Sequence, residues 1–139
     1  MNKYKFSDIK IGLSESFGVK IKSSMMDKFL AISDDTNLLH MDENYAKERG
    51  FLGRVVYGML TSSFYSTLVG VHLPGKYCIL QGIDIQFSKP VFIDDILNIT
   101  GKVTYINSAY KQIEIKAIII NQDNQKVSKA IIKVGVMHE

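Results

Sequence analysis

The second half of the chain is dominated by short runs rich in isoleucine and valine, separated by turn residues. These runs cover residues 77–87, 96–106, 112–121 and 126–136. Apolar and polar residues alternate in 112–117, which is the period-two pattern of a strand with one dry and one solvated face. Short polar turns at 107–109 and 121–125 predict antiparallel neighbours. Residues 14–21 alternate as well and predict an early strand in the same sheet.

Helical spacing is found between the early strand and the later ones. Residues 24–32 place apolar side chains at helical intervals behind a serine cap, and 42–49 predict a short helix that Gly50 ends. Residues 55–75 contain no Asp, Glu, Lys or Arg. Five serine and threonine residues interrupt this stretch, which favours a helix buried on nearly all sides in a globular domain over a membrane span.

The predicted fold is therefore α+β, with one long apolar helix wrapped by a curved antiparallel sheet. Four or five strands can cover such a helix only by curling around it. The outer face and the open edges of the sheet favour a dimer. A chain of 139 residues, 46% of them hydrophobic, fits a single domain over residues 1–139 and buries about two-thirds of its unfolded surface.

Charge and cysteine content exclude several classes of function. The net charge of +3 comes from Lys and Arg scattered singly, so the basic stripe that binds nucleic acid is absent. The single cysteine, Cys78, forms no internal disulfide, and its place in an apolar strand predicts an inert, buried thiol. No basic and apolar leader is visible at the amino terminus, so we expect a cytoplasmic protein with no membrane partner.

Few residues can carry chemistry. His40, His72 and His138 are far apart in sequence and lack metal-ligand spacing, and no glycine-rich phosphate loop is present. We therefore expect neither a metal nor a cofactor. Residues 33–42 do bring carboxylates and a histidine together. Taken alone, this segment leaves two interpretations open: an acid–base pair, or a turn shaped by Asp35 and Asn37 before a helix capped by Asp42.

The surrounding sequence resembles a known family. An Asp-x-Asn-x-x-His run at residues 35–40 is followed by an acidic residue and a short helix, and then by Gly-Arg-Val-Val-Tyr-Gly-Met-Leu at 53–60. Similarity continues through 73–75 and 87–91. In these features the chain resembles the (R)-specific enoyl-CoA hydratases of the MaoC-like dehydratase family. The family has the hot-dog fold, which agrees with the architecture predicted from periodicity.

The resemblance implies a lyase that reversibly adds water to the double bond of a trans-2-enoyl thioester. The product is the (R)-3-hydroxyacyl thioester, and the substrate is carried on coenzyme A or on an acyl carrier protein. Asp35 and His40 match the catalytic pair of the family, which holds one water and acts as base and acid. Two coupled groups share their titration, so the sequence does not assign the first proton to either. The resemblance also implies a homodimer, with a higher oligomer left open.

Three further positions have roles implied by the family. Gly58 begins the apolar helix, where its backbone amide can bind the enolate oxygen at the positive end of the helix dipole; the alternative is close helix packing. Ser66 aligns with a family serine near the catalytic pair, or is a hydroxyl satisfied within its own helix. Asn37 is expected to fix the loop rather than to touch the substrate.

The chain also departs from the family pattern. Leu38 and Glu43 stand where proline is common, which leaves the loop less rigid. Tyr57 replaces a common histidine before the Gly-Met pair, and its bulk predicts a reshaped acyl pocket. Basic residues that could meet phosphate groups, or be ordinary solvated charges, are Arg54, Lys76 and Lys89. Two alternative functions stay open, a hot-dog acyl-CoA thioesterase and a non-catalytic acyl-thioester-binding dimer.

Overall fold

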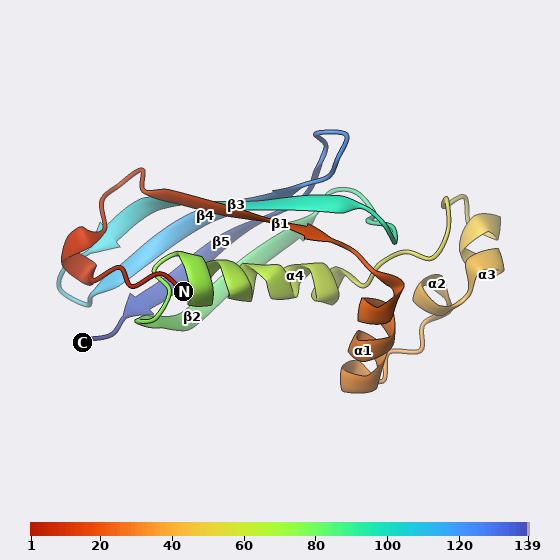
Figure 1. Cartoon of the computed structure of the whole chain (residues 1–139), viewed down its shortest axis with the longest axis horizontal. Helices are drawn as coiled ribbons and strands as arrows, with labels where there is room; N and C mark the ends of the chain where they lie inside the picture. Colours follow the sequence, from red (N-terminus) through yellow and green to blue (C-terminus); the bar gives the residue numbers. More distant parts are fainter. Residues whose placement is uncertain (139) are drawn as a thin grey trace.

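The alternating segments form five strands of one antiparallel sheet. In the computed structural model, which describes residues 1–138, the strands are β1 (Ser14–Lys20), β2 (Cys78–Phe87), β3 (Ile96–Asn107), β4 (Gln112–Ile120) and β5 (Lys126–Val136). Their order across the sheet is β1-β3-β4-β5-β2 (Figure 1). Both β4 and β5 therefore lie between β2 and its sequence neighbour β3, and β1 and β2 form the two edges.

The central helix lies along the inner face of the sheet (Figure 1). It consists of α4 (Gly58–Thr67) and a continuing π-helical turn, η2 (Leu68–His72). Alternate side chains of β4 are buried beneath it, as the period-two pattern predicts. Gly101 of β3 permits the close approach of helix and sheet, because an added Cβ would lie 2.6 Å from Cδ2 of Leu68. The predicted hot-dog architecture is confirmed.

One expectation about this helix is wrong. It is not buried on nearly all sides, because Met59 is 62% exposed and Ser63 and Ser66 are also exposed on the same helix. A five-stranded sheet curls around only part of a helix, and the opposite side stays open to solvent. None of the helices formed by residues 1–138 is long and apolar enough to cross a membrane.

Three short helices form an arm beyond the amino end of α4 (Figure 1). They are α1 (Ser23–Ser33), α2 (Leu38–Met41) and α3 (Glu43–Glu48), and a 3₁₀ turn, η1 (Phe6–Asp8), precedes the first strand. The predicted serine cap is wrong: the N-cap of α1 is Lys22, with no capping side chain. Asp42 does cap α3, accepting a 2.8 Å hydrogen bond from the Tyr45 amide. The four residues of α2 carry no periodicity and were not predicted.

Cys78 offers a test of the packing at the start of β2. Burial raises the pKa of this thiol from 9.0 to about 11. The neutral thiol therefore contributes to the stability of the folded state below pH 9, and this contribution is lost as the pH rises through about 11. The reason is that the thiol ionises at lower pH in the unfolded chain than in the folded one. At pH 8 we expect iodoacetamide to label Cys78 about 100-fold more slowly than an ordinary thiol. The urea-unfolded chain is the control, and equal rates in both states would contradict the partial burial that the structure gives this residue.

Candidate active site

The imidazole of His40 is held by the backbone of a distant segment. Its Nδ1 lies 2.7 Å from the carbonyl oxygen of Val55, and the Val55 amide donates a 3.1 Å hydrogen bond to the carbonyl of Leu39. A carbonyl oxygen only accepts hydrogen bonds, so Nδ1 carries the proton. In the neutral ring, Nε2 then holds the free lone pair. His40 is therefore oriented with Nε2 as its proton-accepting atom.

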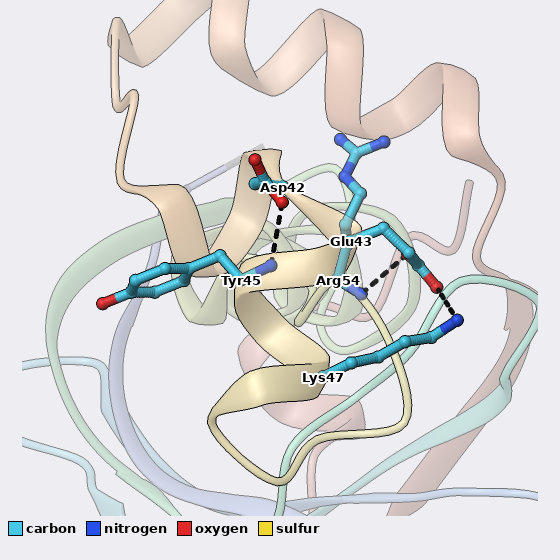
Figure 2. Close-up of polar contacts among 5 residues, drawn as sticks. All are labelled: Asp42, Glu43, Tyr45, Lys47 and Arg54. Atoms are coloured by element: carbon cyan, nitrogen blue, oxygen red, sulfur yellow. Dashed lines mark hydrogen bonds and ion pairs between the residues drawn. The ribbon is translucent and has the colours of Figure 1, made fainter.

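Arg54, the residue before Val55, also ties this segment to the helical arm. Arg54 donates through Nε to the carbonyl of His40 at 2.7 Å, and its amide donates to Oε2 of Glu43 at 3.2 Å. Glu43 also pairs with Lys47 at 3.4 Å (Figure 2). Figure 2 shows the Arg54 side chain turned away from Glu43 and Lys47. Arg54 is therefore not an ordinary solvated charge, because its guanidinium helps to hold the backbone of His40.

Tyr57 lies between the two residues of the Asp-x-Asn-x-x-His run that are expected to act together. Its hydroxyl donates a 2.8 Å hydrogen bond to the backbone carbonyl of Asp35, and its ring centroid is 4.3 Å from that of His40. The Tyr57 ring also packs against Phe29 of α1, at 4.7 Å, and the hydroxyl lies 3.7 Å from Sδ of Met41. Burial, and then the charge of Asp35, raise the pKa of Tyr57 above its usual value of 10.0, so the hydroxyl stays a donor at neutral pH.

This placement differs from the role expected for Tyr57. A phenol in place of histidine predicted a reshaped acyl pocket, but the Tyr57 ring packs against His40 and does not line the cleft that His40 faces. Tyr57 as a whole residue is only 2% exposed.

The loop that carries Asp35 follows a left-handed residue, Asp34, at the end of α1. Oδ1 of Asp35 accepts a 3.1 Å hydrogen bond from the Asn37 amide, and Oδ1 of Asn37 accepts from the Leu39 amide at 2.9 Å. Asn37 thus caps α2 and shapes the loop. The side chain of Asp35 is exposed, and its Oδ2 accepts no hydrogen bond from the described residues. Loop shaping consequently uses one carboxylate oxygen and leaves the other available.

A cleft of about 330 Å³ opens beside His40. Gly58, the first residue of α4, lines it, and no acceptor among the described residues meets the Gly58 amide. This donor is at the positive end of a ten-residue helix, where a developing negative charge is stabilised. The remaining walls are mostly apolar and consist of Phe51, Val55, Val56, Thr61, Phe87, Ser88, Lys89, Pro90, Val91 and Val127.

The predicted site residues differ in their position relative to the cleft. His40 and Gly58 share the cleft, and Asp35 is joined to His40 through Tyr57. Ser66 is joined to none of them: it is exposed and lies eight positions after Gly58 along the helix, a distance of about 12 Å.

Another hydroxyl takes the place beside Gly58. Thr61 lines the cleft and donates a 2.8 Å hydrogen bond to the Gly58 carbonyl. It was missed from the sequence, although its position one helical turn after Gly58 could have indicated it. Of the basic candidates, Lys89 lines the cleft, and Lys76 lies over the Tyr77 ring at 5.4 Å. Within residues 1–138, no three His, Cys, Asp or Glu side chains are grouped to hold a metal ion.

Comparison with known proteins assigns the family. Residues 7–124 match the family model described as MaoC like domain. The chain belongs to the MaoC-like domain family. An (R)-specific enoyl-CoA hydratase from Rhodospirillum rubrum is 38% identical over 99 residues, which are 71% of this chain and 69% of that protein. One from Aeromonas caviae is 38% identical over 95 residues, 68% of each chain.

The structural comparison agrees with this assignment. The solved (R)-hydratase from A. caviae has a TM-score of 0.88 to this MaoC-like domain at 27% identity, covering 92% of this chain and 97% of that one. The predicted family and the enzyme class, a hydro-lyase, are thus confirmed.

Proposed function

We propose that this MaoC-like domain catalyses the reversible addition of water to a trans-2-enoyl-CoA thioester, forming the (R)-3-hydroxyacyl thioester. The observation that carries the proposal is the orientation of His40, whose Nδ1 is fixed on the Val55 carbonyl at the wall of a cleft shared with the Gly58 amide. The printed activities of the relatives from R. rubrum and A. caviae support the same reaction.

Each of the site residues has a separate role in the proposed reaction. Asp35 and Nε2 of His40 hold one water and together remove its proton as the oxygen attacks C3 of the enoyl group. The electron pair of the C2–C3 double bond moves onto the thioester oxygen, and the Gly58 amide stabilises that oxygen. C2 then takes a proton from Asp35 or His40, and the thioester carbonyl re-forms. The elements of water are thus added overall. Acid–base catalysis of this kind contributes about 10²- to 10⁴-fold to the rate, and one oxyanion donor about 10²- to 10³-fold.

The cleft walls fit the acyl part of such a substrate. Val56, Phe87, Val91 and Val127 present apolar surface close to His40 and Gly58. Burying each methylene of an acyl chain against such walls contributes about 0.8 kcal/mol. Binding energy from the chain therefore holds the thioester carbonyl near the helix end.

The decisive experiment follows trans-2-butenoyl-CoA and its longer homologues with the purified protein. Loss of the ultraviolet absorbance of the conjugated thioester, with a chelator present and no added nucleotide, is the expected result. Oxidation of the product by an (R)-specific dehydrogenase confirms its stereochemistry. Release of free thiol without hydration would favour the thioesterase alternative, and binding without either reaction would favour a non-catalytic acyl-binding protein.

We also propose that two copies of the chain associate through the open side of the central helix and the β2 edge. Large apolar side chains are exposed there on α4 and β2: Met59, Leu80, Ile83 and Phe87. The three on β2 pair with Val134, Ile132 and Ser128, which are buried, so they face the helix side of the sheet. An exposed apolar patch beside an unpaired strand edge is typical of an association surface.

Association can be measured directly. Sedimentation equilibrium is expected to give the mass of a dimer or a higher assembly. Ile83→Lys places a charge in the patch and should shift the protein toward monomer, whereas Ile131→Lys, on the other face of the sheet, should not. A monomeric wild-type protein would contradict the proposal.

A further inference from the structure

Tyr57 contacts both members of the proposed acid–base pair by different parts of its side chain. The hydroxyl bonds to the backbone of Asp35 at 2.8 Å, and the ring packs on the imidazole of His40 at 4.3 Å. We propose that Tyr57 is a positioning residue that fixes the Asp35 loop relative to His40. This role rests on the proposed hydratase function and assigns to Tyr57 no contact with the substrate.

The hydrogen-bond pattern of the loop carries the proposal. Apart from the bond to Tyr57, the hydrogen bonds that the described residues 34–37 donate or accept join partners no more than four positions apart. Examples are Asp35 N to Ser33 Oγ and Asn37 N to Asp35 Oδ1. The bond from Tyr57 spans 22 positions. Local bonds fix the shape of the loop but not its place on the domain. The hydrogen bond from the Tyr57 hydroxyl therefore ties the Asp35 loop to the start of α4.

Tyr57 can serve as an anchor because it is itself immobile. Its side chain is almost fully buried, and its ring lies between Phe29 of α1 and His40 of α2. Its backbone carbonyl accepts hydrogen bonds from the amides of Leu60 and Thr61 in the first turn of α4. Motion of Asp35 relative to His40 therefore requires either the loss of the hydroxyl bond or the movement of this packed ring.

The placement matters because proton transfer depends on distance. A base must be within hydrogen-bond reach of the proton it removes, and a displacement of about 1 Å can lower the rate about 10²-fold. Asp35 itself is exposed. A buried anchor that acts on its backbone leaves the carboxylate free to bind water.

Tyr57→Phe tests this role, because it keeps the ring and removes only the hydroxyl. We expect kcat for butenoyl-CoA hydration to fall about tenfold while KM changes by less than about twofold. Tyr65→Phe is the matched control. Tyr65 lies within α4, is 1% exposed, and its substitution removes a 2.6 Å bond to Ser128 Oγ, but among the described residues its hydroxyl bonds to neither Asp35 nor His40. Its kcat should equal that of the wild type.

Two further measurements separate positioning from a merely structural role. If Tyr57 acts through Asp35, then adding Tyr57→Phe to Asp35→Asn should lower kcat no further. Amide hydrogen exchange at residues 35–39 of the unliganded protein should be faster by about tenfold in Tyr57→Phe and unchanged in Tyr65→Phe. The exchange experiment needs no turnover.

The outcomes distinguish this inference from the proposed function. An active wild-type enzyme whose Tyr57→Phe variant has normal kcat, or normal exchange in the loop, would overturn the positioning role alone. Equal losses of kcat in Tyr57→Phe and Tyr65→Phe would do the same, because they would reflect general loss of packing. A wild-type protein without hydratase activity would refute the proposed function, and the positioning role with it.

Discussion

Asp35→Asn is expected to lower kcat for enoyl-CoA hydration by about 10²- to 10⁴-fold. The amide is almost the same size as the carboxylate but cannot accept a proton from water. Its Oδ1 can still accept the 3.1 Å hydrogen bond from the Asn37 amide, so the shape of the loop is retained. Initial rates over a range of substrate concentrations should show the loss in kcat, with little change in KM.

Asp34→Asn provides the matched control for this variant. Asp34 is the adjacent exposed carboxylate and lies in the left-handed region at φ 53°, which asparagine adopts readily. The same chemical change one position away should leave kcat within about twofold of the wild type. If Asp35→Asn kept full activity, the acid–base mechanism would have to be abandoned.

His40→Asn is the second variant for which we expect a large effect. The Nδ2 of asparagine occupies nearly the position of the imidazole Nδ1, so it can donate to the Val55 carbonyl that His40 contacts at 2.7 Å. The variant lacks any counterpart of Nε2. We expect kcat to fall by about 10²- to 10⁴-fold while the thermal midpoint changes little. Stopped reactions analysed for 3-hydroxyacyl-CoA would measure losses that are too large for continuous assays.

A control variant and a double variant test whether the loss is specific to His40. His138→Asn changes an exposed histidine near the carboxyl terminus and should leave kcat unaltered. The double variant with Asp35→Asn should be about as slow as the slower single variant, because two groups that act on one water are lost as a unit. Near-normal activity in His40→Asn would show that Nε2 carries no proton in the reaction.

Individual elements show how far the sequence is informative. Residues 126–136 were predicted as a strand and form β5 with the same bounds, because alternate burial leaves a direct record in residue type. The cap of α3 by Asp42 agrees with one of the two interpretations that the sequence left open, since capping depends on a side chain near in sequence. The pairing of β2 with β5 was not predicted, because strand order depends on contacts between segments some 50 residues apart.

The same division holds for the site. The spacing of Asp35, Asn37 and His40, and the glycine that starts the central helix, are properties of the sequence, and they indicate the family and the reacting groups that we propose. The tertiary structure alone decided that the Val55 carbonyl orients the imidazole, that Arg54 holds the His40 backbone, and that Tyr57 joins the pair. Each of these contacts ends on a backbone carbonyl oxygen. Every residue type carries that same atom, so such contacts leave no pattern in the sequence and exist only once the chain has folded.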